Sequence, residues 1–439
     1  MSGAESFSAI IKIFLELKEF SLPFFLFLFE LIKTFWWLLL VIFLFFIFRS
    51  LWLLFIQAKW RAKQKEILLE IKIPKEVLQS IKSMEVAFSG LWQVYDPPNF
   101  REKWLEGKIL KSLSLEIVGS GGNIRLFIRT PKALQGLVES VIYGQYPNCE
   151  ISVAEDYTKN IPQNIPNDEW NMWGCDYKAI KDDIYPIRTY TFFEEKPDIK
   201  EEKRIDPLAL LMEGMSRLKK GEQIWFQIII QPVTNKENNY RDRGGAIIDK
   251  LINRPAKKKP SPIIKEALKI VATGKPTGSG EEGPIITPSK KELTRGEREV
   301  VSAIENKIGK HCFETTIRFI YLSEANAYFG PNKLLVMSFL NQFAATNLNA
   351  LVPNSKTITS RHTLTLFFLD RRRGYLRKRK LFRSYVHQLP TSFPKKTTIV
   401  LNVEELASLY HFPSQEIVPI PAVPRAEMKK GGPPSILFS

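Results

Sequence analysis

The sequence contains little cysteine and little histidine, and this scarcity excludes several classes of protein. Among its 439 residues there are three cysteines and four histidines. The cysteines are too widely separated to form a disulfide framework or a zinc-binding pair. They are Cys149, Cys175 and Cys312. The histidines belong to no metal-binding or catalytic motif, so we expect structural roles for His311, His362, His387 and His411. The composition thus predicts no metal and no cofactor.

Signatures of catalysis are also absent. The sequence contains no phosphate-binding GxxxxGK[ST] loop, no HExxH and no GxSxG. The carboxylate pairs Asp182-Asp183 and Glu404-Glu405 have no partner histidine nearby in the sequence, and we expect surface or helix-capping roles for them. We therefore expect a protein that is not an enzyme, with an enzyme of a new type as the least favoured alternative.

The one long apolar run lies near the N-terminus. Residues 34–56 include a single charged residue, Arg49. A helix of about 20 apolar residues crosses a bilayer core, and this run is too long for the apolar part of a signal peptide. We expect a single membrane-spanning helix that continues to about residue 66. Tryptophans suit both interfacial belts, at Trp36, Trp37, Trp52 and Trp60.

Two features of this region leave alternatives open. Arg49 either extends toward the nearer interface or faces a partner helix in a homo-oligomer. Residues 1–33 read as an amphipathic segment lying in the membrane interface, and residues 20–33 are a weaker candidate for a second crossing because they contain Glu30 and Lys33.

Flanking charge predicts the orientation of the span. The basic side follows the span, at Lys59, Arg61, Lys63 and Lys65. Before it, three lysines are offset by four glutamates. The positive-inside rule therefore places the large C-terminal body in the cytoplasm, at the inner membrane. The net charge of +17 also favours acidic partners such as nucleic acid or anionic lipid.

The body has the pattern of an α+β protein. Residues 67–157 alternate as β-α-β-β-α-β, with a Gly-rich hairpin turn at residues 119–122, and this order is typical of a ferredoxin-like domain. We expect a linker at 158–184. A second ferredoxin-like unit, beginning with a strand at 185–195, is expected over residues 185–369. It has an insertion at 234–292 that is partly disordered and holds one short helix near 262–272.

The C-terminal part begins with a basic run within the segment 370–415, which ends in a strand and a helix from about Val403. A Pro/Gly-rich tail follows at 416–439. Between Arg371 and Arg383, eight of thirteen residues are basic. They are Arg371, Arg372, Arg373, Arg377, Lys378, Arg379, Lys380 and Arg383. Such a run contacts phosphates of DNA or of lipid head groups, or it is only a solvated surface. Tyr375 and Phe382 either stack on bases or are buried against the preceding segment 363–369, which reads as a strand.

Several stretches taken together carry a family resemblance. They are MEVAFSGLW (84–92), SLEIVGSGGNIRLFIRTP (114–131), QYPNCEISVAEDYT (145–158), VLNVEELASLYHFP (400–413) and PRAEMKKGGPPS (424–435). The set, which spans nearly all of residues 67–437, resembles a membrane-anchored family of unknown function from candidate-phyla bacteria. The resemblance implies that this region precedes, or is encoded beside, a HerA/FtsK-like ATPase of the type IV secretion coupling class. The sequence ends at Ser439, where that ATPase would begin, so we expect a separately encoded motor.

Two hypotheses follow from these observations. The first is a non-enzymatic membrane scaffold of a type IV secretion-like or conjugative DNA-transfer system, which docks a separate P-loop ATPase. The second is a membrane-associated nucleic-acid-binding protein that acts through the basic run.

Overall fold

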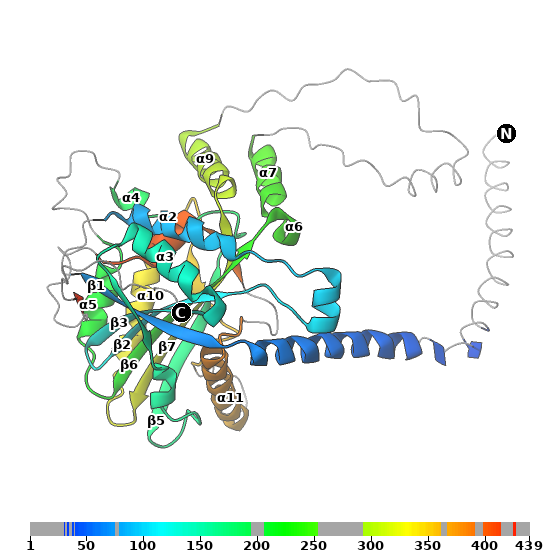
Figure 1. Ribbon diagram of the computed structural model, residues 1–439, viewed down its shortest axis with the longest axis horizontal. Coiled ribbons are helices and arrows are strands. Elements are labelled where there is room, and N and C mark those ends of the chain that lie inside the picture. The colour runs from blue at the N-terminus through cyan, green and yellow to red at the C-terminus, as the bar shows by residue number, and fades with distance from the viewer. Residues whose placement is uncertain are drawn as a thin grey trace, which may run out of the picture. The chain divides into compact units, whose positions relative to one another are not determined.

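The computed structural model describes residues 40–74, 79–194, 206–252, 293–360, 367–390, 398–413 and 425–426, together with residues 30, 33, 34, 37 and 38. Most of the predicted amphipathic segment, the helix expected near 262–272 and most of the tail lie outside these residues. The chain divides into two compact units (Figure 1). The anchor unit is Met1–Gln64 with Pro97–Ile109, and the body is Lys65–Asp96 with Leu110–Ser439.

The anchor unit contains the predicted apolar helix. It runs through Leu40–Lys63, is strongly apolar over most of its length, and is almost entirely exposed. Within the described residues it is the one helix whose length and composition suit a membrane crossing. The unit also includes the π-helix η2 (Glu102–Glu106). The guanidinium of Arg49 lies 4.7 Å from the centre of the Trp104 ring, so a contact within the chain accounts for this charge.

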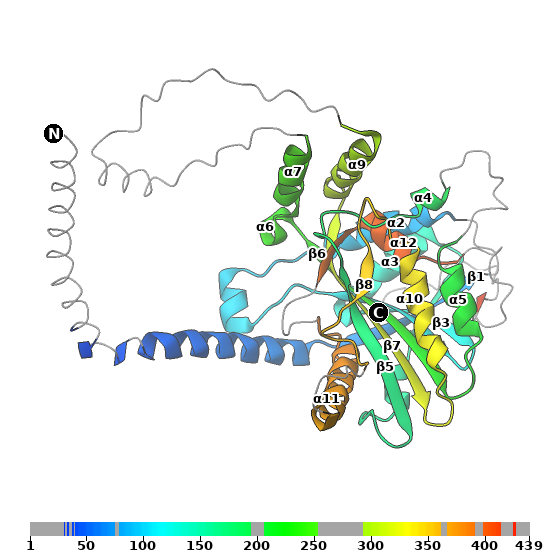
Figure 2. The same cartoon turned by 180° about the vertical axis from the view of Figure 1, so that it is seen from behind.

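The body is a mixed α+β structure built on one ten-stranded sheet (Figures 1 and 2). Its first half follows the predicted element order: β1 (Glu66–Pro74), α2 (Ile81–Leu91), β2 (Leu113–Ser120), β3 (Asn123–Pro131), α3 (Gln135–Gln145) and β4 (Glu150–Ala154). The strands are neighbours in the order β4-β1-β3-β2, and all pairs are antiparallel. The predicted hairpin turn is confirmed: Gly121 and Gly122 have positive φ angles of 53° and 86°, which suit glycine.

The second half repeats this strand order. Its main elements are β5 (Trp170–Ala179), α5 (Ala209–Ser216), β6 (Glu222–Val233), β7 (Cys312–Glu324), α10 (Leu334–Asn341) and β8 (Leu351–Pro353). The strands are neighbours in the order β8-β5-β7-β6, again with antiparallel pairs. The two halves do not form separate sheets, because β2 pairs with β6 along the whole of β2.

The first strand of the second half is not where the sequence placed it. The predicted strand 185–195 is an irregular segment followed by the short helix α4 (Thr191–Glu194), and β5 lies in the predicted linker. The backbone N–H groups of Ile187 and Tyr190 donate to side chains of Glu405 and Ser408 rather than to a neighbouring strand. In β5, Gly174 and Asp176 are poor strand formers, and they interrupt the sequence pattern by which a strand is predicted.

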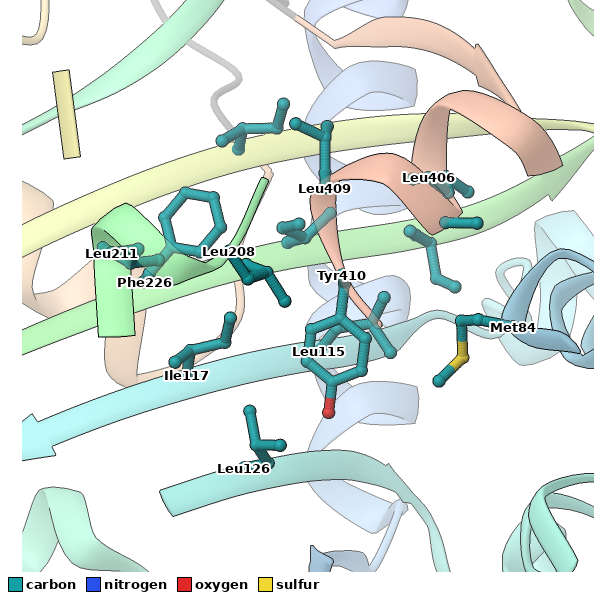
Figure 3. Packing of buried hydrophobic residues seen from close by; sticks show 14 of the residues in the cluster. Met84, Leu115, Ile117, Leu126, Leu208, Leu211, Phe226, Leu406, Leu409 and Tyr410 are labelled. Carbon is teal, nitrogen blue, oxygen red and sulfur yellow. The ribbon is translucent and has the colours of Figure 1, made fainter. Parts of the chain in front are cut away.

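The two faces of the sheet are covered differently. One face is buried under α2, α3, α5, α10 and α12 (Val403–Leu409), and its core is mainly apolar, with the carboxylate of Glu222 buried at its end as an acceptor for the hydroxyl of Tyr321. Figure 3 shows this packing: Leu406, Leu409 and Tyr410 come from α12 and the residue after it, and the sheet contributes Leu115 and Phe226. The opposite face carries α11 (Phe367–Val386), which packs on a smaller cluster around Trp225.

The remaining elements extend the body. Helices α6 (Asn235–Asn238) and α7 (Tyr240–Leu251) lie in the predicted insertion, and α9 (Arg295–Gly309) follows it, all between β6 and β7. Residues of α7 and α9 belong to a third apolar cluster. The predicted C-terminal strand and helix are confirmed as β9 (Ile399–Asn402) and α12, which begins at Val403 with a capping box of Asn402 and Glu405. The described part of the tail forms β10 (Arg425–Ala426), parallel to the end of β1. Short 3-10 helices are η1 (Trp92–Val94), η3 (Lys132–Leu134), η4 (Tyr157–Asn160) and η6 (Gly330–Lys333).

Candidate functional site

The basic run is a helix that is anchored by its C-terminal half. Leu381, Phe382 and Tyr385 recur at helical spacing and are buried against the sheet. The ring of Phe382 lies 6.2 Å from that of Trp225, at an interplanar angle of 30°. Phe382 is therefore part of the core and is not available to stack on bases. The preceding segment is not a strand where it is described, because residues 367–369 already belong to α11.

Most of the predicted contact residues are exposed on the outer face of α11. Two are half-buried, Arg377 and Lys378, and the Nζ of Lys378 donates to Asn171 Oδ1 at 2.7 Å. The other six are exposed: Arg371, Arg372, Arg373, Arg379, Lys380 and Arg383. Tyr375 is 42% exposed, and the guanidinium of Arg379 lies 5.7 Å from its ring centre. Six arginines and two lysines of this run lie on one helix, which therefore presents a strongly cationic surface.

A small cavity adjoins the cationic face. It has a volume of about 210 Å³ and is lined by Gln163, Ile165, Arg379, Phe382, Arg383, Val386 and His387. The two guanidinium groups and the imidazole can donate hydrogen bonds to the oxygens of a phosphate group, whereas the amide of Gln163 already donates to the backbone oxygens of Thr158 and Ile161. The sequence analysis missed Gln163 and His387. The spacing of Arg379, Arg383 and His387, four residues apart each time, was a signal that these three share a helix face.

Beneath α11 the sheet carries a row of buried polar side chains. Glu116, Gln227, Arg318 and Asp176 lie directly opposite one another on the adjacent strands β2, β6, β7 and β5. We call this row the polar ladder. Its members are at most 2% exposed.

Each side chain of the ladder is bonded to the next. Gln227 Nε2 donates to Glu116 Oε1 at 3.2 Å, and Arg318 donates to Gln227 Oε1 at 3.4 Å and to Asp176 Oδ1 at 2.7 Å. Burying charged groups is costly unless they are paired and hydrogen-bonded, and the ladder meets both conditions.

The ladder also holds the C-terminal end of α11. Arg318 donates to the backbone oxygens of Ser384, at 2.7 Å, and of Leu389, at 3.0 Å. Gln227 donates to the backbone oxygen of Tyr385 at 3.3 Å. The last carbonyls of a helix have no partner within the helix and carry partial negative charge, so a buried arginine satisfies and neutralises them. This arrangement fixes where the cationic face of α11 lies on the body.

A branch of the same network crosses to the first half of the sheet. Tyr157 donates from its hydroxyl to Glu116 Oε2, and it also lies 2.7 Å from the hydroxyl of Tyr385. Arg129 donates to both carboxylate oxygens of Asp156, at 2.9 and 3.1 Å. Burial favours the neutral form of each group and would raise the pKa of Asp156, but the hydrogen bonds from Arg129 lower it below its usual value. Burial raises the pKa of Tyr157 and of Tyr385 well above the usual range.

The other residues singled out in the sequence have structural partners. The pair Asp182-Asp183 contacts Arg243, and Glu404 pairs with Lys310. Glu405 is a capping residue as expected, but it is not on the surface. It is fully buried with Lys307, at 2.9 Å, and burial raises its pKa.

The histidines and cysteines that the structure describes are mostly buried or stacked. His411 lies between Asp206 and the backbone of Ala407, and His311 stacks on Trp92. His362 is outside the described residues. All three cysteines are buried and free, and burial raises the pKa of Cys149 and of Cys312 to about 12, which keeps these thiols protonated and weakly nucleophilic. No cluster of three or more metal-ligating side chains occurs in the part of the chain that the structure describes.

Comparison with known proteins gives a family without an assigned activity. No curated protein matches the chain. A family described as a domain of unknown function (DUF8128) matches residues 62–424. This range includes α11, the polar ladder and every strand of the sheet except β10. The match begins at the C-terminal end of the apolar helix and covers most of the sequence. The chain therefore belongs to this family, the domain of unknown function DUF8128.

Proposed function

We propose that the chain is a non-enzymatic membrane scaffold that docks a separate P-loop ATPase in a type IV secretion-like or conjugative DNA-transfer system. The observation that carries this proposal is the covalent connection between the apolar helix and the body. An exposed apolar helix of membrane-spanning length ends at Lys63, and the first strand of a large α+β body begins three residues later, at Glu66. Such a chain tethers its body to a bilayer. The secretion context and the ATPase partner rest on the family resemblance described above.

The proposal includes an orientation. The basic cluster that follows the span supports a body on the cytoplasmic side, where ATP is available to a partner. Reporter fusions to Ser439 in cells should give the cytoplasmic signal. A C-terminus exposed on the outer side would contradict both the orientation and the ATPase partnership.

The docking of an ATPase has a direct test. An open reading frame beside this gene that encodes a P-loop and no apolar span is co-expressed with the full-length chain. We expect the two products to co-elute from detergent as a stable complex, and we expect the chain alone neither to bind nor to hydrolyse ATP. Saturable hydrolysis by the homogeneous chain, or separate elution of the two products, would contradict the scaffold.

The exposed arginines of α11 favour a second candidate function, which is binding of nucleic acid. Each neutralised phosphate contact contributes about 0.7–0.9 to the slope of log K against log salt. Replacing Arg372, Arg373, Arg379 and Arg383 with Ser in the full-length chain, held in neutral nanodiscs, should flatten that slope by roughly 3 for DNA.

The matched control removes the same charge elsewhere on the body. Lys82, Lys178, Lys219 and Lys220 are exposed and lie outside α11. Their replacement with Ser should leave the slope nearly unchanged. Binding to anionic vesicles is measured on the same proteins, since lipid head groups offer the same chemistry at about 1 kcal/mol per charge. If the α11 variant matches wild type toward both DNA and vesicles across the salt series, the basic run is only a solvated surface.

We also propose that each half of the sheet is a ferredoxin-like unit, so that the body is a fused pair of such units. The support is the shared element order and the shared antiparallel strand order, β4-β1-β3-β2 in one half and β8-β5-β7-β6 in the other.

A further inference from the structure

The segment Pro97–Ile109 leaves the body and packs on the apolar helix. It lies between α2 and β2 in the sequence, yet it belongs to the anchor unit. The indole N–H of Trp52 donates to the backbone oxygen of Trp104 at 3.0 Å, and the guanidinium of Arg49 lies over the Trp104 ring. We call this segment the anchor loop.

The backbone of the anchor loop approaches the helix closely. Gly107 has a φ angle of 73°, and a Cβ added there would lie 2.4 Å from the carbonyl carbon and oxygen of Ile56. No other residue type fits this position without moving one of the two backbones. Within the loop, the backbone N–H of Asn99 donates to Glu102 at 2.8 Å, and Lys108 pairs with Glu102 at 3.2 Å. The loop is thus an ordered element with a defined seat on the helix.

The loop directs its large apolar side chains to the outside. Phe100 is 81% exposed and Leu105 is 65% exposed, which are among the highest values for apolar residues in the structure. The ring of Phe100 lies 6.2 Å from that of Trp104. Two exposed cations, Arg101 and Lys103, flank these residues. Exposed aromatic and aliphatic side chains beside lysine and arginine are typical of segments that lie in the bilayer interface.

We propose that the anchor loop is a second membrane contact, which lies in the interface beside the spanning helix. Phe100 and Leu105 enter the acyl-chain boundary, while Trp104 and Trp52 lie at head-group depth. The inference rests on the proposed membrane anchoring. The structure favours lipid as the occupant for two reasons. The loop packs directly on the helix proposed to cross the bilayer, and its cations complement anionic head groups.

The proposal gives Arg49 a role. A cation inside an apolar span is costly unless it reaches the interface or a partner. The Trp104 ring, which the anchor loop brings to the helix, holds the guanidinium at the depth where aromatic residues and head groups meet.

The test measures the depth of single residues in the full-length chain. An environment-sensitive fluorophore is attached at Phe100→Cys or Leu105→Cys, and the native cysteines are buried and do not compete. The proteins are reconstituted in vesicles of phosphatidylcholine and phosphatidylglycerol. Nitroxide lipid then quenches from within the bilayer, and iodide quenches from water. We expect nitroxide lipid to quench both positions several-fold more strongly than iodide does.

Two control positions separate the outcomes. Leu54→Cys lies on the apolar helix, where the native side chain is 64% exposed, and Ile180→Cys replaces a body residue that is 61% exposed. Quenching of Phe100→Cys and Leu105→Cys by iodide, at the level seen for Ile180→Cys, would overturn the proposal. Protection from both quenchers would overturn it as well, because a protein would then cover the loop. Loss of nitroxide quenching at Leu54→Cys would instead contradict the membrane anchoring itself.

Discussion

The two faces of the sheet are built on different physical principles. The face under α2, α3, α5, α10 and α12 is mainly apolar, so burial of carbon surface is its main source of stability, and changes that conserve side-chain volume are tolerated there. The face under α11 places four polar side chains at matching positions on four strands. A slip of one residue between strands would move these groups into the apolar face, so the polar ladder selects one register. The first face mainly stabilises the fold, and the second restricts the strands to one register.

The largest expected effect is on the ladder. The substitution Arg318→Met removes the guanidinium that faces Asp176, together with its hydrogen bonds to the backbone oxygens of Ser384 and Leu389. Removing one partner of a buried pair costs about 3–5 kcal/mol. Chemical denaturation of the full-length chain in detergent, followed by tryptophan fluorescence, measures this loss.

The double variant Asp176→Leu/Arg318→Met is the control for that prediction. Without the buried carboxylate, part of the stability should return, although the hydrogen bonds from Arg318 to the carbonyls of Ser384 and Leu389 are still missing. If Arg318→Met alone lowers the free energy of unfolding by less than about 1 kcal/mol, the hydrogen bonds of Arg318 do not hold the C-terminal end of α11.

On the apolar face we expect a graded response instead. Leu115 is fully buried, and Leu115→Ala should cost about 2–5 kcal/mol, through lost burial and the cavity left behind. The smaller deletion Ile117→Val should cost only about 0.5–1.5 kcal/mol. Denaturation midpoints of the two variants check this ratio. Equal losses for both would contradict the claim that volume governs this face.

The pH dependence sharpens the comparison, because the network that includes Asp156 contains ionised groups. The pKa of Asp156 is lowered in the folded state, so its contribution is complete above the unfolded value of about 3.9 and is lost as the pH falls below that value through the folded pKa. At neutral pH, Asp156→Asn should destabilise the protein by about 1.5–3 kcal/mol. The difference from wild type should shrink as the pH falls below about 3.9, and melting temperatures across a pH series show whether it does. A difference that is constant down to the lowest pH would exclude this linkage.

The smallest effect on stability is expected at the outer face of α11. Because Arg372, Arg373, Arg379 and Arg383 are exposed, replacing all four with Ser should change the free energy of unfolding by no more than about 0.5 kcal/mol per site. Thermal melts of the same variant that is used for the salt series measure this. A large destabilisation would mean that these arginines are part of the ladder side of the helix.

The sequence predicted elements well where a local pattern decides the structure. The hairpin at residues 119–122 follows from glycine chemistry, and the start of α12 follows from the Asn402–Glu405 spacing. It failed where partners from distant segments decide. In the predicted strand 185–195, side chains of α12 accept from the N–H groups of Ile187 and Tyr190, and the buried Asp176 of β5 is paired with Arg318 across the sheet. Of the candidate site, the cations of α11 were found, whereas the cavity residue Gln163 comes from a loop more than 200 positions earlier.

The pairing of β2 with β6 has a consequence for how this protein can be divided. Unpaired strand edges recruit other chains and promote aggregation. Each half of the sheet ends in such an edge. The edge of the first half is Leu113–Ser120 of β2, and the pairing of β2 with β6 covers this edge of both halves. A fragment that stopped after β4 would expose that whole edge to solvent. The smallest portion of the body that stays soluble therefore contains both halves, and any gene rearrangement that moves this body to a new protein has to move them together.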